Sequence, residues 1–203
     1  MRSTVPKIRA SNLSAHKALV RTQLLDAFEE LLLAQSYEEV SIAAVAARAG
    51  VARNTVYNYA SDKSELLTAA AQRHIGRLFL PLQQASQVQD AALRLRGMLE
   101  VAMSSFLDSP ISPTVFKALM HHGTEADLDV AAQGSQELIP FLVEAIDDGV
   151  QGGVFRAFAD TAFLFDLIAG ALVTAVENVL ESPETGGQRI SEAIDFVMGA
   201  LRA

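Results

Sequence analysis

The chain has 203 residues, half of them apolar and only 6% aromatic, with a formal net charge of −8. This length allows one sizeable core, or a small domain joined to a larger one. Because the sequence contains no cysteine, disulfides and thiolate metal sites are excluded.

The charge is unevenly distributed along the chain. Residues 1–80 carry ten Lys and Arg against seven Asp and Glu, whereas residues 81–203 carry six against seventeen. A basic N-terminal part on an acidic body suggests that one end binds a polyanion, although the basic start is equally well explained as a solubilising tail. No apolar segment follows Met1, so we expect no signal peptide and a cytoplasmic protein.

The first part of the chain shows helical spacing of apolar residues. Residues 1–12 are polar and basic, and we expect a flexible tail there. Ser41 is a suitable cap for a second helix, and Gly50 allows the turn that ends it. The predicted helices of this part span residues 13–35, 41–49, 52–59 and 61–80.

The rest of the chain has longer helices separated by Pro and Gly. Pro140 is expected to kink one of them, and residues 149–156 are the only weak strand candidate. Residues 163–176 are apolar but fewer than the roughly 20 that span a membrane, so we expect a buried helix and no membrane partner. These helices are predicted at residues 84–108, 113–121, 125–148, 160–181 and 188–202. Together the elements predict an all-α protein of about nine helices.

Residues 41–67 are the most informative stretch. The first helix carries an apolar face, Gly50 provides a turn, and the second helix, residues 52–59, has polar side chains that suit a DNA groove better than a core. Arg and Asn pair with the edges of guanine and adenine, and Thr, Tyr and Lys bind phosphate oxygens. The candidate DNA-binding residues are Ser41, Arg53, Asn54, Thr55, Tyr57, Asn58, Tyr59 and Lys63.

This stretch resembles the N-terminal signature of the TetR family of transcriptional regulators. The matching residues are Ser41, Ile42, Ala49, Gly50, Val51, Thr55, Tyr57, Tyr59 and Lys63. The resemblance implies a three-helix helix-turn-helix headpiece at residues 13–60 and a larger helical domain for ligand binding and dimerisation at residues 61–203. It also implies a repressor that a small-molecule effector releases from a palindromic operator.

The resemblance further assigns roles within the headpiece. Thr55, Tyr57 and Lys63 are expected mainly at phosphates, and Tyr59 is either a DNA contact or a core residue. The best candidates for reading bases are Arg53, Asn54 and Asn58.

Two residues depart from the family pattern. Ala60 stands where the family usually has Phe, and Ala52 where it often has a Ser or Thr that caps the recognition helix. Loss of such a cap typically costs ~1 kcal/mol. Both departures favour an alternative, a small-molecule sensor dimer with a decayed headpiece. A third hypothesis, an all-α enzyme, has no catalytic signature to support it, and we expect neither enzyme activity nor a cofactor.

The helix predicted at 160–181 has apolar residues on more than one face and must be covered on both sides. We expect it and the last helix to pair with their copies across a two-fold axis, and a deeply buried intramolecular helix is the alternative. Such a homodimer would set two recognition helices about one DNA turn apart (~34–36 Å). The predicted interface comprises Leu164, Ile168, Leu172, Val176, Val179, Ile190, Ile194, Val197 and Leu201.

The resemblance also implies an effector pocket in the body of the protein. Its candidate residues are Met103, Phe106, Met120, His121, Phe141 and Asp166. They predict an apolar or amphipathic effector, although such residues more often form plain core. Adjacent His121 and His122 point about 100° apart on a helix, so we expect no metal site there.

Overall fold

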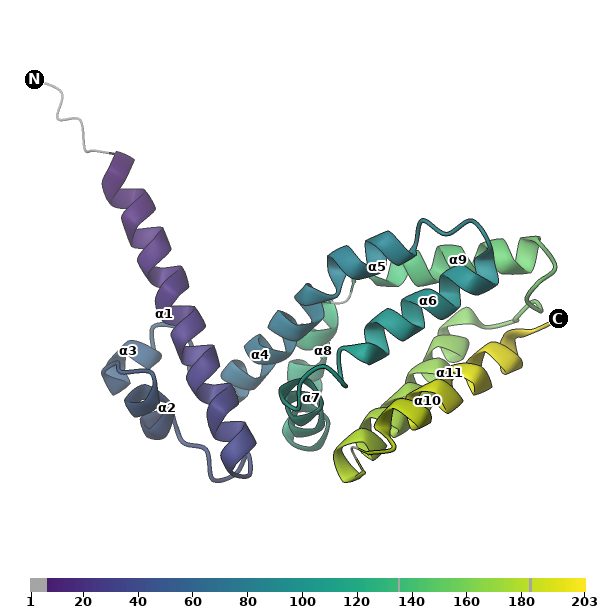
Figure 1. Ribbon diagram of the computed structural model, residues 1–203. Coiled ribbons are helices and arrows are strands. Elements are labelled where there is room, and N and C mark those ends of the chain that lie inside the picture. The colour runs from purple at the N-terminus through teal and green to yellow at the C-terminus, as the bar shows by residue number, and fades with distance from the viewer. Residues whose placement is uncertain (1–6, 135, 183) are drawn as a thin grey trace, which may run out of the picture. The chain divides into compact units, whose positions relative to one another are not determined.

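The computed structural model describes residues 7–134, 136–182 and 184–203. Every regular element in these ranges is a helix, which confirms the all-α prediction (Figure 1). Contacts within the chain divide it into two compact units, Met1–Ala70 and Ala71–Ala203. The domain boundary that we placed after Ala60 stays a prediction.

The first unit contains α1 (Lys7–Ala34), α2 (Ile42–Arg48), α3 (Arg53–Val56) and the beginning of α4 (Lys63–Arg77). Helix α1 begins inside the range predicted as a flexible tail, because Lys, Arg and Ala at positions 7–10 are favourable helix residues. Residues 1–6 of that predicted tail lie outside the described residues. The inner side of α1 buries Val20, Leu24 and Phe28, as its apolar spacing predicts.

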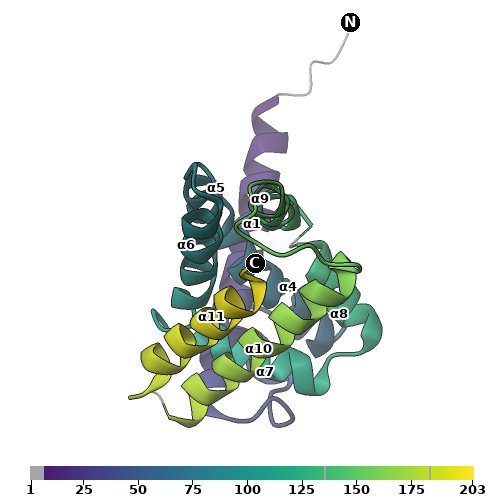
Figure 2. The same ribbon diagram turned by 90° about the vertical axis from the view of Figure 1, so that its right-hand side faces the viewer.

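The second unit is built around α6, which lies against α5, α9 and α11, while α10 runs beside α11 (Figures 1 and 2). Helix α7 packs against α8 and α10. Leu95 and Met98 of α6 and Ile194 of α11 are fully buried at its centre. The helices are α5 (Phe79–Ala85), α6 (Ala91–Ser104), α7 (Ile111–His122), α8 (Glu125–Gln133), α9 (Ile139–Gln151), α10 (Thr161–Glu181) and α11 (Gly186–Leu201).

The described residues hold eleven helices, where the sequence predicts about nine. The predicted helix 125–148 is divided into α8 and α9, and Pro140 lies in the first turn of α9 instead of kinking a longer helix. Pro81 likewise lies in the first turn of α5. A proline is tolerated in a first turn because the missing N–H has no partner in the helix there.

The connection from α9 to α10 is tied to the end of α11. Gly153 turns the chain with a φ of 71°, and the Phe155 ring then packs so closely on Gly149 that any side chain at position 149 would overlap it. Phe155 forms an isolated antiparallel bridge with Arg202, and the Arg156 N–H donates to the Leu201 carbonyl at 2.9 Å. The weak strand candidate at 149–156 therefore begins inside α9 and ends in a single bridge.

Candidate DNA-binding surface, effector cavity and apolar face

Helices α2 and α3 follow one another through a tight turn. The Ser41 hydroxyl accepts the Ala44 N–H at 3.2 Å and so caps α2, while Val45 and Ala46 are buried beneath it. Gly50 has a φ of 69°, a left-handed conformation that residues with a side chain rarely adopt, and α3 starts three residues later. This order of helix, glycine turn and short helix is a helix-turn-helix.

Helix α3 is shorter than predicted, Arg53–Val56 instead of 52–59. Ala52 supplies no side-chain cap, and the Thr55 N–H donates to the Ala52 carbonyl at 2.8 Å. Beyond α3 the Tyr59 N–H donates to the Val56 carbonyl at 2.8 Å, a tighter spacing than that of an α-helix. Val56 is fully buried and holds this tightly wound segment on the core.

The outer side of α3 presents polar side chains to solvent. Arg53, Asn54, Tyr57 and Asn58 are exposed, whereas Thr55 and Tyr59 are half-buried. The Arg53 guanidinium donates to the Tyr57 hydroxyl at 3.2 Å and lies 5.9 Å from the centre of its ring. The structure thus brings the predicted groove-facing residues together on one surface.

Lys63 has a structural role that the sequence did not indicate. Its ammonium donates to the Tyr37 carbonyl at 2.8 Å and to the Glu38 carbonyl at 3.1 Å, and it lies 4.3 Å from the centre of the Tyr37 ring. An ammonium has three N–H donors, so at most one is left for a phosphate. We therefore revise its expected main role from phosphate contact to fixing the α1–α2 loop on α4.

The two alanines that depart from the family pattern have different surroundings. Ala60 is only 3% exposed, and its N–H donates to the Val56 carbonyl at 3.0 Å, so this small side chain is covered. Ala52 is exposed and leaves α3 uncapped by any side chain. The core of the headpiece therefore covers Ala60, whereas the N-terminus of α3 lacks the stabilisation of a side-chain cap.

A second site is a cavity of about 260 Å³ within the second unit, between the end of α4, the segment directly after α6, and helices α7 and α8. Its wall is mainly apolar, with three polar residues, His74, Ser105 and Ser112. The Ser112 hydroxyl lies 3.0 Å from His74 Nδ1, while the Ser105 hydroxyl donates to the Ala102 carbonyl at 2.7 Å. The remaining lining residues are Ala71, Ile75, Leu78, Phe106, Val115, Phe116, Leu119, Met120, Leu128 and Ala131.

The structure brings only part of the predicted pocket to this cavity. Phe106 and Met120 line it, whereas Met103 is buried outside the lining and His121 is exposed. Phe141 packs instead on Phe79, with ring centres 6.1 Å apart. The side chain of Asp166 lies outside the described part of the structure. Sequence reasoning missed His74 and Ser112, since they are 38 residues apart and nothing local marks either of them.

The predicted dimer interface is largely occupied within the protomer itself. Seven of its nine residues are buried within the protomer, and the other two, Ile168 and Leu172, are half-buried. Helical period identifies two apolar faces on α10 but does not say which one faces inward. The buried residues are Leu164, Val176, Val179, Ile190, Ile194, Val197 and Leu201.

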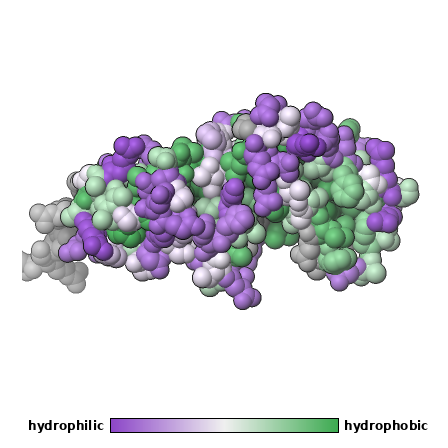
Figure 3. Space-filling view, turned by 90° about the horizontal axis from the view of Figure 1, so that it is seen from below, coloured by the Kyte–Doolittle hydropathy of each residue, from purple (hydrophilic) through white to green (hydrophobic). Residues whose placement is uncertain are grey.

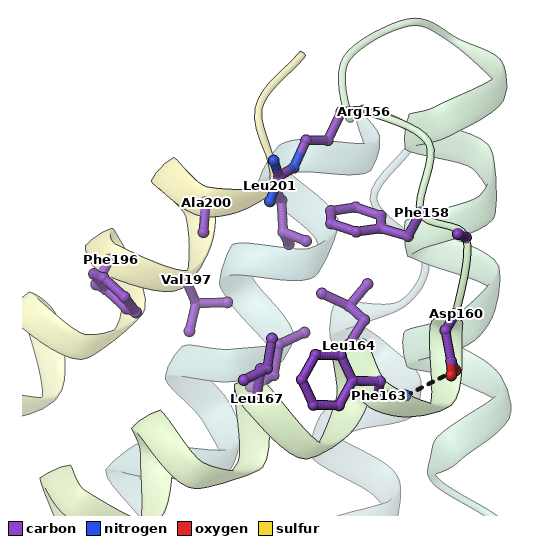
Figure 4. A pocket seen from close by; sticks show the side chains of 12 residues that line it. Arg156, Phe158, Asp160, Phe163, Leu164, Leu167, Phe196, Val197, Ala200 and Leu201 are labelled. Carbon is purple, nitrogen blue, oxygen red and sulfur yellow. Dashed lines mark hydrogen bonds between the residues drawn. The ribbon is translucent and has the colours of Figure 1, made fainter.

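The opposite side of α10 and α11 carries large apolar side chains in solvent. Phe163 is 58% exposed, Leu167 57% and Phe196 70%. Figure 3 shows apolar side chains gathered over this part of the molecule, and Figure 4 shows the three residues around a groove of about 440 Å³. We call Phe163, Leu167 and Phe196 the outer apolar face.

The groove is closed at one end by the segment before α10. The Arg156 guanidinium lies 4.9 Å from the centre of the Phe158 ring, and Asp160 caps α10 by accepting the Phe163 N–H at 3.0 Å (Figure 4). By length and composition alone, Phe163–Glu181 is one helix that is apolar enough to cross a membrane, with 29% of its most apolar window buried. A helix that packs in a core or an interface of a soluble protein meets the same criterion.

Within the described residues no three His, Asp or Glu side chains gather into a group that could hold a metal ion. The rings of His121 and His122 lie 6.4 Å apart, and both side chains are exposed.

Comparison with known proteins identifies relatives of this chain. The family described as "Bacterial regulatory proteins, tetR family" matches residues 24–70, which include α2 and α3. The chain is 29% identical over 154 residues to the HTH-type transcriptional activator FasR of Mycolicibacterium smegmatis, covering 75% of this chain and 67% of FasR. It is 34% identical over 100 residues to the HTH-type transcriptional regulator BetI of Yersinia pestis, covering 48% of this chain and about half, 49%, of BetI.

Solved structures share the fold over nearly the whole chain. FadR from Bacillus subtilis in complex with stearoyl-CoA superposes with a TM-score of 0.76 at 15% identity, covering 89% of this chain and 99% of FadR. SmeT of Stenotrophomonas maltophilia in complex with triclosan gives a TM-score of 0.71 at 18% identity, covering 91% of this chain and 92% of SmeT. At these identities the likeness shows the fold: a helix-turn-helix followed by a helical body.

Proposed function

This chain belongs to the TetR family of DNA-binding transcriptional regulators, which are not enzymes, and we propose that it is a cytoplasmic repressor whose operator is a palindrome and whose effector is a small molecule. The observation that carries the proposal is the exposed Arg53–Tyr57 pair on α3, directly after the glycine turn. A short polar helix braced by two others is the shape that enters a major groove.

The proposed reading of DNA divides the exposed residues by chemistry. Arg53, Asn54 and Asn58 have the fork-shaped or amide groups that pair with base edges. Thr55 and Tyr57 have hydroxyls that donate to phosphate oxygens. Ser41 already uses its hydroxyl to cap α2, so we assign it to the support of α2 rather than to a base. The half-buried Tyr59 keeps both of its predicted roles.

The proposed effector site is the cavity that contains His74 and Ser112. Helix α4 supports this assignment, because one unbroken helix carries both Lys63, which holds the α1–α2 loop, and His74, which lines the cavity. An effector that displaces His74 therefore acts on an element that the headpiece also uses. Release follows if effector and operator favour different conformations.

We propose that the outer apolar face binds a second copy of the chain. Large side chains from two adjacent helices form this face, and only 29% of the most apolar window of α10 is buried within one protomer. A two-fold dimer would cover the same face on both copies, and it would supply the two headpieces that a palindrome requires. This assignment replaces the inner stripe predicted from the sequence.

Repression is the direction we propose, and activation is the second candidate. SmeT is described as the repressor of a multidrug efflux pump, whereas FasR is named as an activator. A reporter gene under a promoter that contains the selected operator separates the two. Repression predicts that co-expression of the chain lowers reporter output, and a rise in output would instead assign activation.

The experiment that tests DNA recognition is selection of bound duplexes from a random pool by the full chain, at a stated salt concentration. We expect enrichment of one palindromic sequence. Binding that is weak, salt-sensitive and independent of sequence would contradict the proposal and favour the small-molecule sensor with a decayed headpiece.

A further inference from the structure

The wall of the cavity contains one hydroxyl, that of Ser112, that contacts a side chain of another helix instead of a carbonyl of its own helix. The Ser105 hydroxyl donates to the Ala102 carbonyl within α6. The Ser112 hydroxyl instead points to His74 Nδ1 on another helix, at 3.0 Å, and Ser112 is 9% exposed. Ser112 is buried and His74 is half-buried, and this pair offers a polar partner to a ligand in the cavity.

The pair can accept a hydrogen bond from a ligand whichever of its two members donates to the other. A serine hydroxyl has one O–H and two lone pairs. If Ser112 donates to His74, both lone pairs are left; if His74 donates to Ser112, one lone pair and the O–H are left. An acceptor lone pair remains in either case. A ligand hydroxyl can donate to it, whereas a carboxylate has no proton to donate.

The rest of the wall selects against charge and large size. Lysine, arginine, aspartate and glutamate are absent from the described residues that line the cavity. Transfer of an unpaired ion into such a site is strongly unfavourable. The volume of about 260 Å³ is smaller than the roughly 300–1,000 Å³ typical of sites for drug-sized ligands.

Aromatic side chains in the wall favour a ring. Phe106 and Phe116 meet edge to face, with ring centres 5.6 Å apart, and both line the cavity. Such a pair offers a ring edge and a ring face to a further aromatic group. We propose that the effector is a compact, uncharged molecule with one aromatic ring and one hydroxyl, which donates to Ser112. The inference rests on the proposed function, because it names the ligand class of the same cavity.

Three matched probes test this ligand class on the full chain: 4-propylphenol, propylbenzene and 4-propylbenzoate, with affinities measured by isothermal titration calorimetry. We expect propylbenzene to bind about five-fold more weakly than 4-propylphenol, the equivalent of one net hydrogen bond. The benzoate should bind more weakly than either, because its carboxylate is buried without a cationic partner.

Two serine variants make the assignment specific. Ser112→Ala should remove the preference for the phenol over propylbenzene, whereas Ser105→Ala, which deletes another hydroxyl from the same wall, should keep it. Equal binding of the phenol and propylbenzene to the parent chain would overturn the proposal, and so would an unchanged preference in Ser112→Ala. Failure of 4-propylphenol to bind, or binding of stearoyl-CoA in its place, would overturn it as well.

The duplex selection keeps this inference separate from the proposed function. Enrichment of a palindrome without binding of the phenol would leave the DNA-binding regulator intact and reject the ligand class. Binding of the phenol with its Ser112 dependence, but without a selected operator, would support the ligand class and reject the regulator.

Discussion

Tyr57 is the residue whose chemistry and position are best matched to DNA. Its side chain is 45% exposed, and its hydroxyl already accepts a hydrogen bond from Arg53. An exposed tyrosine held by a neighbouring arginine contributes little to the core, so its replacement should affect binding far more than folding.

We expect Tyr57→Ala to weaken operator binding about ten-fold, the cost of roughly 1–2 kcal/mol for a lost phosphate contact and a released Arg53. Fluorescence anisotropy with the selected duplex measures the change. Leu33→Ala, which truncates an exposed side chain of α1 in the same unit, should bind as the parent does. If Tyr57→Ala binds as tightly as Leu33→Ala, α3 is not the groove-facing helix.

Lys63 gives the contrasting case of a cation that faces the protein. Replacement by methionine keeps much of the side-chain length and removes both hydrogen bonds to the α1–α2 loop. We expect Lys63→Met to lower the free energy of unfolding of the headpiece by about 1–3 kcal/mol, since two carbonyls lose a charged donor. Hydrogen exchange at residues 37–40 reports the loss. A variant with normal exchange but weaker operator binding would return Lys63 to the phosphate role first predicted.

At the scale of elements, the sequence predicted which segments are helices better than where they end. The boundaries that moved lie at prolines and caps: Pro140 lies in the first turn of α9, and α6 starts after Asp90, whose side chain accepts the Leu93 N–H. Helix α3 ends three residues earlier than predicted, where the Asn58 and Tyr59 N–H groups donate to carbonyls three residues back. These outcomes depend on single local contacts, and the apolar period of a segment does not contain that information.

The site was predictable to the extent that it is local in sequence. The groove-facing residues of α3 are contiguous, and the structure gathers them as the motif indicates. The cavity joins residues from three separate helices and from the segment after α6, and His74 and Ser112 become neighbours only through packing. The interface residues stay a prediction for a related reason: α10 is apolar on two sides, and its packing against α7 and α11, which the sequence does not show, decides which side is inner.

The end of α9 provides a stability test. Gly149 lies under the Phe155 ring, and an added methyl group would overlap it, so Gly149→Ala must displace Phe155 from the core. We expect a loss of about 1–3 kcal/mol in the free energy of unfolding, as for other overpacked cores. Thermal or urea unfolding measures it.

Gly97→Ala is the matched control for Gly149→Ala. Gly97 also lies within a helix, but no atom lies within 4 Å of the position that its Cβ would take. There the intrinsic preference for alanine should add up to about 1 kcal/mol. If both variants were equally stable, the close approach of Phe155 would not constrain position 149.

At the scale of the whole molecule, function as proposed requires two copies. Phe196 is the most exposed of the large apolar residues in the structure as described, and it lies on α11 beside the groove (Figure 4). A charge at this position would have to be buried by the partner, at a high cost in free energy. Because a two-fold interface contains the same residue from both copies, one substitution places two charges in it.

We expect Phe196→Asp to convert the dimer to a monomer and to lower operator affinity at least ten-fold, because the two headpieces then bind independently. Sedimentation equilibrium measures the first effect and anisotropy the second. Leu93→Asp places the same charge at a residue of α6 that is 62% exposed and outside the outer apolar face, and it should stay dimeric. A dimeric Phe196→Asp variant would assign the interface to another surface.

Because α4 belongs to both units, the two units cannot be separated without cutting a helix. The division between the two units falls after Ala70, inside the helix Lys63–Arg77, and not in an extended linker. Proteases cleave extended and locally unfolded segments, so this junction resists nicking for as long as the helix persists. The DNA-binding end is therefore a poor candidate for grafting as an independent module, since any cut that frees it also removes a helical turn from one unit or the other.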